Sequence, residues 1–235
     1  MTTPDKPTSR AVYYAIRRVF QFIAWCLTRL EVTGLENVPP TGGFLIVVNH
    51  LSIADPAVLY LTIPRQCIMF SADKWKTTPG ISHLANTVGV IWVQRGEVDR
   101  AALKQSLDFL KTGWPVGIAP EGTRSKDGVL HPGKPGAAYL ADRARVPVLP
   151  VVVMGTEQLG RNLKRLRRTP VRCVYGRPFL LPSNGRAKTE ELDALTDLIM
   201  CHLAALLDPQ YRGAYATHPQ LKELLGESDS EGAHP

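Results

Sequence analysis

Cysteine is scarce in this chain and irregularly placed. The 235 residues include four cysteines, and no two of them form a Cys-x-x-Cys pair. This spacing argues against a zinc-binding knuckle and against a framework of disulfide bonds. We expect reduced core thiols in a cytosolic compartment, at Cys26, Cys67, Cys173 and Cys201. The polar segment 1–10 shows no cleavage pattern after an apolar run, so we expect no secretory signal.

Signatures of several other enzyme classes are missing. The chain has no Gly-x-Ser-x-Gly elbow, which argues against an α/β-hydrolase. It also has no His-Glu-x-x-His cluster of the kind that binds a catalytic metal. The segment Gly128–Lys134 imitates a phosphate-binding P-loop, but Pro135 stands where Ser or Thr would bind magnesium. We therefore predict no metal and no cofactor.

A long apolar run is missing as well, since crossing a bilayer takes ~20 apolar residues. The segment Arg10–Leu30 has helical periodicity, but Arg17 and Arg18 interrupt it. On a helical wheel its polar residues, Gln21 and Thr28 among them, form a narrow cationic wedge beside a wide apolar arc. This pattern favours a helix lying in the membrane interface, and hence a monotopic protein at the cytoplasmic face. The alternative is a helix packed on the domain core with its arginines in water.

Basic residues outnumber acidic ones, 28 to 21, and give a formal net charge of +7. Such an excess favours anionic partners but does not choose among them. The most basic stretch is 161–168, which could attract lipid headgroups or nucleic acid, or could be an ordinary solvated surface. Few aromatic residues accompany it, which argues against binding to single-stranded nucleic acid. We expect an anionic membrane surface as the partner, and no nucleic acid.

Strands and helices alternate along the remainder of the chain. The predicted strands are 44–48, 68–70, 88–93, 116–119, 148–154 and 171–175, and the predicted helices are 55–62, 100–112, 136–143 and 189–207. This order predicts an α/β fold: a mixed, largely parallel sheet flanked by helices, with an N-terminal amphipathic membrane-interface helix. We expect residues 1–30 to form a tail and that helix, 31–210 to form one catalytic domain, and 211–235 to form a C-terminal tail.

The first candidate site is the segment Asn49–Asp55, which directly follows the apolar strand 44–48. Loops at the carboxyl ends of strands are the usual place for a site in an α/β sheet. Asp55 could accept the Nδ1 proton of His50, which would leave the other ring nitrogen free to act as a base. Alone, the spacing is weak evidence, because Asp55 could simply cap its helix while His50 lines a loop.

Three further segments carry candidate residues. In Pro120–Ser125, Gly122 allows close approach of the backbone to a ligand, and Arg124 offers a planar fork to a phosphate. The segment Gly89–Arg95 places an arginine at the end of a buried strand. The segment Val146–Val153 reads as a core strand entered through prolines.

In this order and spacing, the four segments resemble the glycerolipid acyltransferase family, which includes glycerol-3-phosphate and lysophosphatidic acid acyltransferases. The family's Asn-His-x4-Asp motif is similar to Asn49-His50…Asp55, including Ser52. Its Phe-Pro-Glu-Gly-Thr-Arg-Ser motif resembles residues 119–125, and its Lys-x-Gly resembles residues 134–136. Its remaining two motifs look like segments 91–95 and 146–153. Two positions depart from the pattern: Ala119 replaces an aromatic residue, and Gln94 replaces an aspartate.

The resemblance implies the transfer of a fatty acyl group from acyl-CoA or acyl-carrier protein to a lysophospholipid hydroxyl, most readily that of 1-acylglycerol-3-phosphate, in phospholipid biosynthesis. His50 would be the general base and Asp55 would orient it. Backbone N–H groups near Gly122 would stabilise the developing oxyanion. The acceptor phosphate would be held by the remaining members of the predicted site, Arg95, Glu121, Thr123 and Arg124.

Two alternatives stay open. One is an acyltransferase that acts on glycerol 3-phosphate or on another lipid or sugar acceptor. The other is an inactive membrane protein that only binds lipid. The acyltransferase hypothesis predicts that His50, Asp55, Glu121, Arg124 and Arg95 converge on one face beside an apolar channel.

Overall fold

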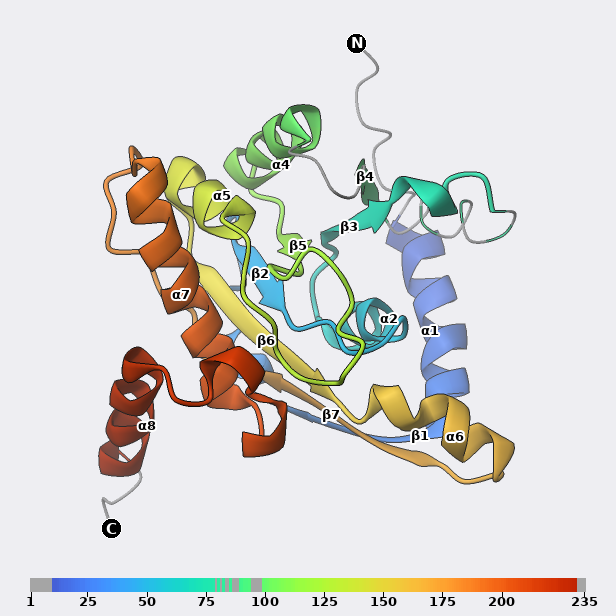
Figure 1. Ribbon diagram of the computed structural model, residues 1–235. Coiled ribbons are helices and arrows are strands. Elements are labelled where there is room, and N and C mark those ends of the chain that lie inside the picture. The colour runs from blue at the N-terminus through green and yellow to red at the C-terminus, as the bar shows by residue number, and fades with distance from the viewer. Residues whose placement is uncertain are drawn as a thin grey trace.

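A seven-stranded sheet forms the centre of the molecule (Figure 1). The computed structural model describes residues 10–78, 80, 82, 85, 89–93 and 99–231. The strand order is β1-β7-β6-β2-β5-β3-β4, and within it only β6 and β7 pair antiparallel. The predicted α/β fold with a mixed, largely parallel sheet is therefore confirmed. The strands are β1 Thr28–Thr33, β2 Leu45–Val48, β3 Ile68–Ala72, β4 Val90–Val93, β5 Val116–Ile118, β6 Val148–Met154 and β7 Thr169–Tyr175.

Helices cover both faces of the sheet, because the central strands are apolar on both sides. In β2, Leu45 and Val47 join a core beneath α4, α5 and α7, whereas Ile46 and Val48 join a second core beneath α2. The alternation follows from the period of two along a strand. The helices are α1 Arg10–Leu27, α2 Asp55–Thr62, α4 Arg100–Lys111, α5 Gly136–Ala144, α6 Leu159–Lys164, α7 Thr189–Leu206 and α8 Pro219–Glu231.

The predicted N-terminal helix ends three residues earlier than expected, at Leu27 rather than Leu30. Thr28 begins β1, which pairs parallel with β7 over its whole length. The alternating sequence TRLEVT suits the outer edge of a sheet, and its β-branched residues favour a strand. The boundary expected at residue 30 therefore falls inside a strand, and α1 runs directly into the sheet.

The C-terminal segment also differs from the expectation of a tail beginning at residue 211. Tyr215 and Leu221 are buried in the core beneath α7. The Tyr215 hydroxyl donates a hydrogen bond to Asp197 Oδ1 at 3.0 Å and accepts one from the Gly133 amide at 3.2 Å. This segment thus belongs to the packed unit, and α8 lies against α7 (Figure 1). The short helix α6 was not predicted either.

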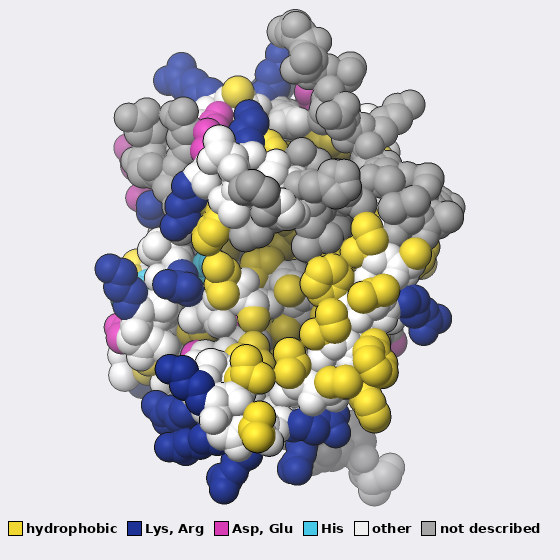
Figure 2. All heavy atoms as spheres, turned by 90° about the vertical axis from the view of Figure 1, so that its right-hand side faces the viewer, with side chains coloured by type: hydrophobic (Ala, Val, Ile, Leu, Met, Phe, Trp, Pro, Cys, Tyr) yellow, Lys and Arg dark blue, Asp and Glu magenta, His cyan; other side chains and the backbone are white. Residues whose placement is uncertain are grey.

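Helix α1 turns part of its polar edge toward the protein. The Arg17 guanidinium donates two hydrogen bonds to the Leu61 carbonyl at the end of α2, at 3.2 and 3.0 Å, and the Gln21 amide donates a third at 2.9 Å. Most of the apolar arc instead faces outward, and Figure 2 shows a broad hydrophobic band there, but Tyr13 is fully buried and its ring contacts that of Tyr60 in α2. The exposed apolar side chains of α1 are Tyr14, Val19, Phe22, Ile23, Trp25 and Leu27.

This orientation differs from that of a helix packed on the core through its whole apolar face, because among the described side chains of that face only Tyr13 is fully buried. Arg17 and Gln21 stabilise the docking of α1 on α2, while Arg18 stays exposed. Among the helices in the described part of the chain, none combines the length and the apolar character needed to span a bilayer.

Candidate active site

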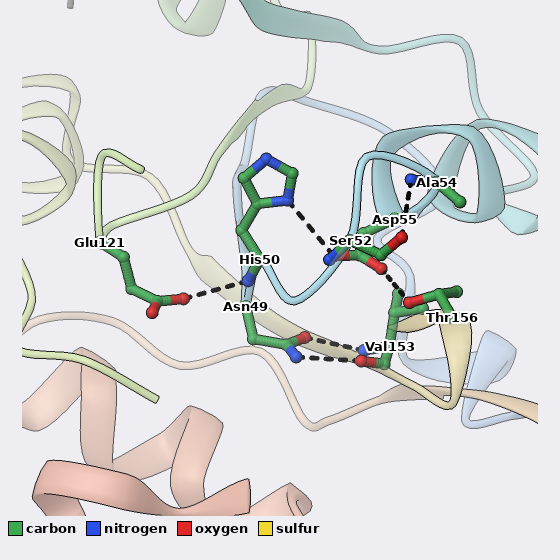
Figure 3. Close-up of polar contacts among 8 residues, drawn as sticks. All are labelled: Asn49, His50, Ser52, Ala54, Asp55, Glu121, Val153 and Thr156. Carbon is green, nitrogen blue, oxygen red and sulfur yellow. Dashed lines mark hydrogen bonds and ion pairs between the residues drawn. The ribbon is translucent and has the colours of Figure 1, made fainter. Parts of the chain in front are cut away.

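The site lies where β2 ends, at the carboxyl edge that it shares with its parallel neighbours β5 and β6. Asn49 is fully buried and anchors the departing chain to β6. Its side-chain amide donates to the Val153 carbonyl at 2.9 Å and accepts from the Val153 amide at 2.8 Å (Figure 3). The Asn49 side chain thereby takes the place of a strand partner for the Val153 backbone. The next residue, His50, therefore leaves the sheet from a fixed point.

His50 and Asp55 form a buried pair. His50 Nδ1 lies 3.3 Å from Asp55 Oδ2, and the two side chains are 14% and 1% exposed. Asp55 begins α2, so the turn of residues 51–54 brings its carboxylate back beneath the imidazole. Figure 3 shows the other ring nitrogen pointing away from Asp55. A carboxylate at Nδ1 favours the tautomer whose Nε2 is an acceptor, which is the form that a base requires.

Two other groups hold the Asp55 carboxylate in place. The Ser52 amide donates to Oδ2 at 2.7 Å, and the Thr156 hydroxyl donates a short hydrogen bond to Oδ1. Thr156 follows β6 and is buried. Both oxygens of Asp55 are thus engaged, and a buried carboxylate with this set of partners has little freedom to rotate away from His50.

Glu121 lies behind His50 rather than in a phosphate site. Its two oxygens accept hydrogen bonds from the backbone amides of His50 and His131, each at 3.0 Å. Burial raises the pKa of this carboxyl above its usual range, while the two amide bonds act in the opposite direction. The expected role in phosphate binding is not supported, because both oxygens are occupied and a carboxylate repels a phosphate. Glu121 instead ties the loop of residues 119–131 to the backbone of His50.

A cavity of about 750 Å³ opens beside the His50–Asp55 pair. This size falls within the range of small-molecule sites. Its wall is mostly apolar and comes from β2, β3, β4, β5, α4 and α5, with Gly122 and Thr123 at the loop. Three cations also line it: Arg100, Lys104 and Lys134.

Arg124, one of the two predicted arginines, is not part of this wall. Arg124 is exposed and does not line the cavity, although its neighbours Gly122 and Thr123 do. The reason is local: the Ser125 amide donates to the His50 carbonyl at 2.8 Å, and the chain turns there toward Asp127. Arg95 lies outside the described residues. His50, Asp55, Gly122 and Thr123 are the members of the predicted site that share the cavity wall.

The Gly122 turn brings Lys134 to the cavity. Gly122 has φ +69°, and a Cβ at this position would lie 3.0 Å from Lys134 Cδ and 3.3 Å from Lys134 Nζ. The Lys134 amide donates to the Pro120 carbonyl at 2.8 Å, which holds the backbone of Lys134 beside the turn. The Gly122 amide itself donates to the Ala119 carbonyl at 3.0 Å. The Gly122 amide is therefore not itself a free oxyanion donor, and the role expected of the backbone N–H groups near it stays a prediction.

Comparison with known proteins agrees with this geometry. The family model described as Acyltransferase matches residues 29–154, more than half of the chain. The chain belongs to the Acyltransferase family. The matched region begins in β1, ends with β6 and contains both His50 and Asp55.

Curated relatives and a solved structure give the same result. The chain is 29% identical over 150 residues to 1-acyl-sn-glycerol-3-phosphate acyltransferase alpha of Mus musculus, covering 62% of this chain and 52% of that protein. It is 30% identical over 176 residues to the protein of the same name from Homo sapiens, covering 73% and 61%. The crystal structure of the 1-acyl-sn-glycerophosphate (LPA) acyltransferase PlsC from Thermotoga maritima superposes with a TM-score of 0.63 at 26% identity, covering 80% of this chain and 76% of that one. The chain spans about half to three fifths of the length of these two mammalian relatives.

Several residues of this site were not predicted as site members. Arg100 and Lys104 lie four positions apart on α4, a spacing that places them on one helix face and could have indicated their common position. Lys134 was noted only as part of a motif. Thr156 had no signal in the sequence, since only the fold brings the end of β6 to Asp55.

Proposed function

We propose that the protein is an O-acyltransferase that moves a fatty acyl group from acyl-CoA or acyl-carrier protein to the free hydroxyl of 1-acylglycerol-3-phosphate, within phospholipid biosynthesis. The observation that carries the proposal is the buried His50–Asp55 pair at the wall of an apolar cavity with cations around it. Membership of the Acyltransferase family and the names of the relatives support the same reaction.

His50 acts as the general base. Its Nε2 takes the proton of the acceptor hydroxyl as the oxygen attacks the thioester carbonyl, and Asp55 stabilises the imidazolium that forms. The tetrahedral intermediate collapses with cleavage of the C–S bond, and the imidazolium returns the proton to the departing thiolate. An ester and a free thiol result. No covalent enzyme intermediate is needed, because a thioester is already activated.

Cations of the cavity wall replace Arg124 as binding groups for the acceptor phosphate. Arg100, Lys104 and Lys134 all line the cavity and are basic side chains that suit a phosphate. Lys134 lies across the Gly122 turn and also supplies a positive charge for the developing oxyanion. The role of Arg95 remains a prediction from the sequence.

The apolar remainder of the cavity holds an acyl chain. Gly117 and Met69 face each other there: a Cβ on Gly117 would lie 2.2 Å from Met69 Sδ. In a Gly117→Ala variant, Met69 must move into the free space of the cavity. We expect the rate with a palmitoyl donor to fall by roughly tenfold relative to that with an octanoyl donor, since crowding by one methyl group has effects of this order.

Competition between the two donors, measured as the ratio of kcat/KM values, tests this expectation. Gly226→Ala is the matched control, because a Cβ there meets no atom within 4 Å. An equal loss with both donors would show that Gly117 does not border the acyl site.

The outward apolar face of α1 supports a monotopic location at the cytoplasmic face of a membrane. Its solvent-exposed aromatic and aliphatic residues lie together in the hydrophobic band of Figure 2. A lipid surface would bury this band, whereas water leaves it exposed. The lipid acceptor would then be presented to the enzyme from the same surface.

Release of free thiol from palmitoyl-CoA, and in parallel from palmitoyl-acyl-carrier protein, tests the proposed function. We expect release that depends on added 1-acylglycerol-3-phosphate and is much slower with glycerol 3-phosphate or with no acceptor. Faster release with glycerol 3-phosphate would assign the other acceptor. No release with any acceptor and either donor would favour an inactive lipid-binding protein.

A further inference from the structure

The last part of α6 and the turn that leads to β7, residues 161–168, form a second exposed surface, here called the basic turn. Its sequence RNLKRLRR contains five cations, two leucines and no acidic residue. Leu163 and Leu166 are 56% and 95% exposed. Single exposed leucines are common on protein surfaces, so what distinguishes Leu166 is its setting among cations and beside the apolar band of α1.

The backbone holds Leu166 in this position at a conformational cost. Leu166 has φ +52°, in the left-handed region where a bulky residue is an outlier. Its amide donates to the Leu163 carbonyl at 3.0 Å, and the Arg167 amide donates to the Asn162 carbonyl at 2.9 Å. Glycine or asparagine would fit this conformation with less strain. The turn therefore presents an apolar side chain where local backbone geometry would favour a small or polar one.

The basic turn is continuous with the apolar band of α1. The Arg168 guanidinium donates to the Thr28 carbonyl, just after α1, at 3.0 and 2.6 Å. It also lies over the Trp25 ring, 5.5 Å from the ring centre. Figure 2 shows the basic side chains of this region at the lower border of the hydrophobic band, on the same face of the molecule.

We propose that the basic turn is a second membrane-contact element, which binds anionic lipid headgroups through its cations and inserts Leu166 among them. This inference deepens the membrane location given under the proposed function and rests on it. The cations complement an anionic surface, and an apolar tip between them can enter the headgroup layer.

Two contact elements fix the orientation of the enzyme, whereas α1 alone would allow it to roll about the helix axis. Helix α2 connects the membrane-facing helix α1 to the site. Its carboxyl end is bound by Arg17 and Gln21 of α1, and its first residue is Asp55. Contact of both elements with one lipid surface thus gives the cavity a constant position relative to that surface.

Binding to vesicles tests the proposal without using activity. The full chain is sedimented with vesicles of phosphatidylcholine alone or mixed with phosphatidylglycerol. We expect Arg165→Glu/Arg167→Glu to reduce partitioning onto the mixed vesicles at least tenfold and to have little effect on phosphatidylcholine alone. Leu166→Asn should reduce partitioning onto the mixed vesicles severalfold while relaxing the strained backbone, so it should fold at least as well as the wild type.

The controls match each change elsewhere on the surface. Leu180→Asn replaces another exposed leucine and matches Leu166→Asn. Arg186→Glu/Lys222→Glu changes the net charge by the same amount as the double variant of the basic turn. Both controls should bind like the wild type. Wild-type binding by both turn variants would overturn the proposal, and so would equal losses in the controls. Turn variants that lose self-association or nucleic-acid binding but still bind vesicles would also overturn it. Because the readout is partitioning, failure of the acyl-transfer reaction would leave this result unchanged.

Discussion

Replacement of His50 by alanine is expected to lower kcat for acceptor-dependent acyl transfer by roughly 10²- to 10⁴-fold, the usual contribution of a general base. The KM values for donor and acceptor should change little, because the imidazole acts in the transition state and the binding groups stay in place. Initial rates of thiol release with saturating 1-acylglycerol-3-phosphate measure the effect. The variant should remain folded, since the anchor of this loop is the neighbouring Asn49.

His131→Ala is the matched control for this prediction. His131 Nε2 lies 2.8 Å from Asp127 Oδ1, and the ring is substantially exposed and does not line the cavity. The backbone amide of residue 131 can still donate its hydrogen bond to Glu121 after the substitution. We expect its kcat to stay within about a factor of two of the wild-type value. Similar losses in the two variants would mean that disturbance of the loop, and not removal of a base, explains the effect of His50→Ala.

Replacement of Asp55 by asparagine is expected to lower kcat by roughly 10²-fold or more, with little loss of folding stability. Asparagine keeps the shape of the side chain but removes the charge that stabilises the imidazolium, and its amide can favour the wrong tautomer of His50. The effect should fall on kcat rather than KM, because Asp55 acts through His50. Steady-state rates, together with urea unfolding of the same samples, separate a chemical effect from a structural one.

A second His–Asp pair in the same chain supplies the control. Asp127 accepts a hydrogen bond from the His131 ring, and that bond, followed by the one from Ser125, lowers the pKa of Asp127 to about 2. Asp127→Asn makes the same chemical change at an exposed position outside the cavity wall. Its kcat should remain near the wild-type value. A kcat for Asp55→Asn close to that of the wild type would remove Asp55 from the mechanism.

The parts of the fold that the sequence predicted are those determined by local pattern. The apolar run before Asn49 forms β2, and Pro56 in the first turn marks the start of α2, which spans the predicted 55–62. Only six residues separate the end of β2 at Val48 from the start of α2 at Asp55, so these two ends must lie close together. For that reason, the pairing of His50 with Asp55 followed from spacing and strand position.

The errors come from features that depend on tertiary contacts. The segment from Thr28 onward continues a helical pattern, but its pairing with β7, far away in the sequence, makes it a strand. Arg124 follows a loop motif closely, yet the hydrogen bond from Ser125 to the His50 carbonyl turns the chain so that Lys134 reaches the cavity instead. No local pattern shows which member of a loop faces a cavity.

Helix α1 illustrates the same limit at a surface. The helical wheel separates its apolar arc from its polar wedge, but it does not state which of them meets the protein. The Leu61 carbonyl at the end of α2 accepts hydrogen bonds from Arg17 and Gln21, so this polar edge meets the protein while most of the apolar arc is left outside. Such carbonyl groups at helix ends need a partner, and here α1 supplies it.

The fate of the acyl group shows whether the protein transfers it to the lipid acceptor with His50 as the base. Palmitoyl-CoA carrying an isotopic label in its acyl chain is incubated with 1-acylglycerol-3-phosphate and the wild-type protein or His50→Ala, with palmitoyl-acyl-carrier protein as the second donor, and the lipids are identified by mass spectrometry. We predict labelled diacylglycerol phosphate, formed one for one with free thiol by the wild type and at most at one hundredth of that rate by the variant. Labelled free fatty acid formed without regard to the acceptor, or labelled diester formed equally fast by His50→Ala, would contradict it.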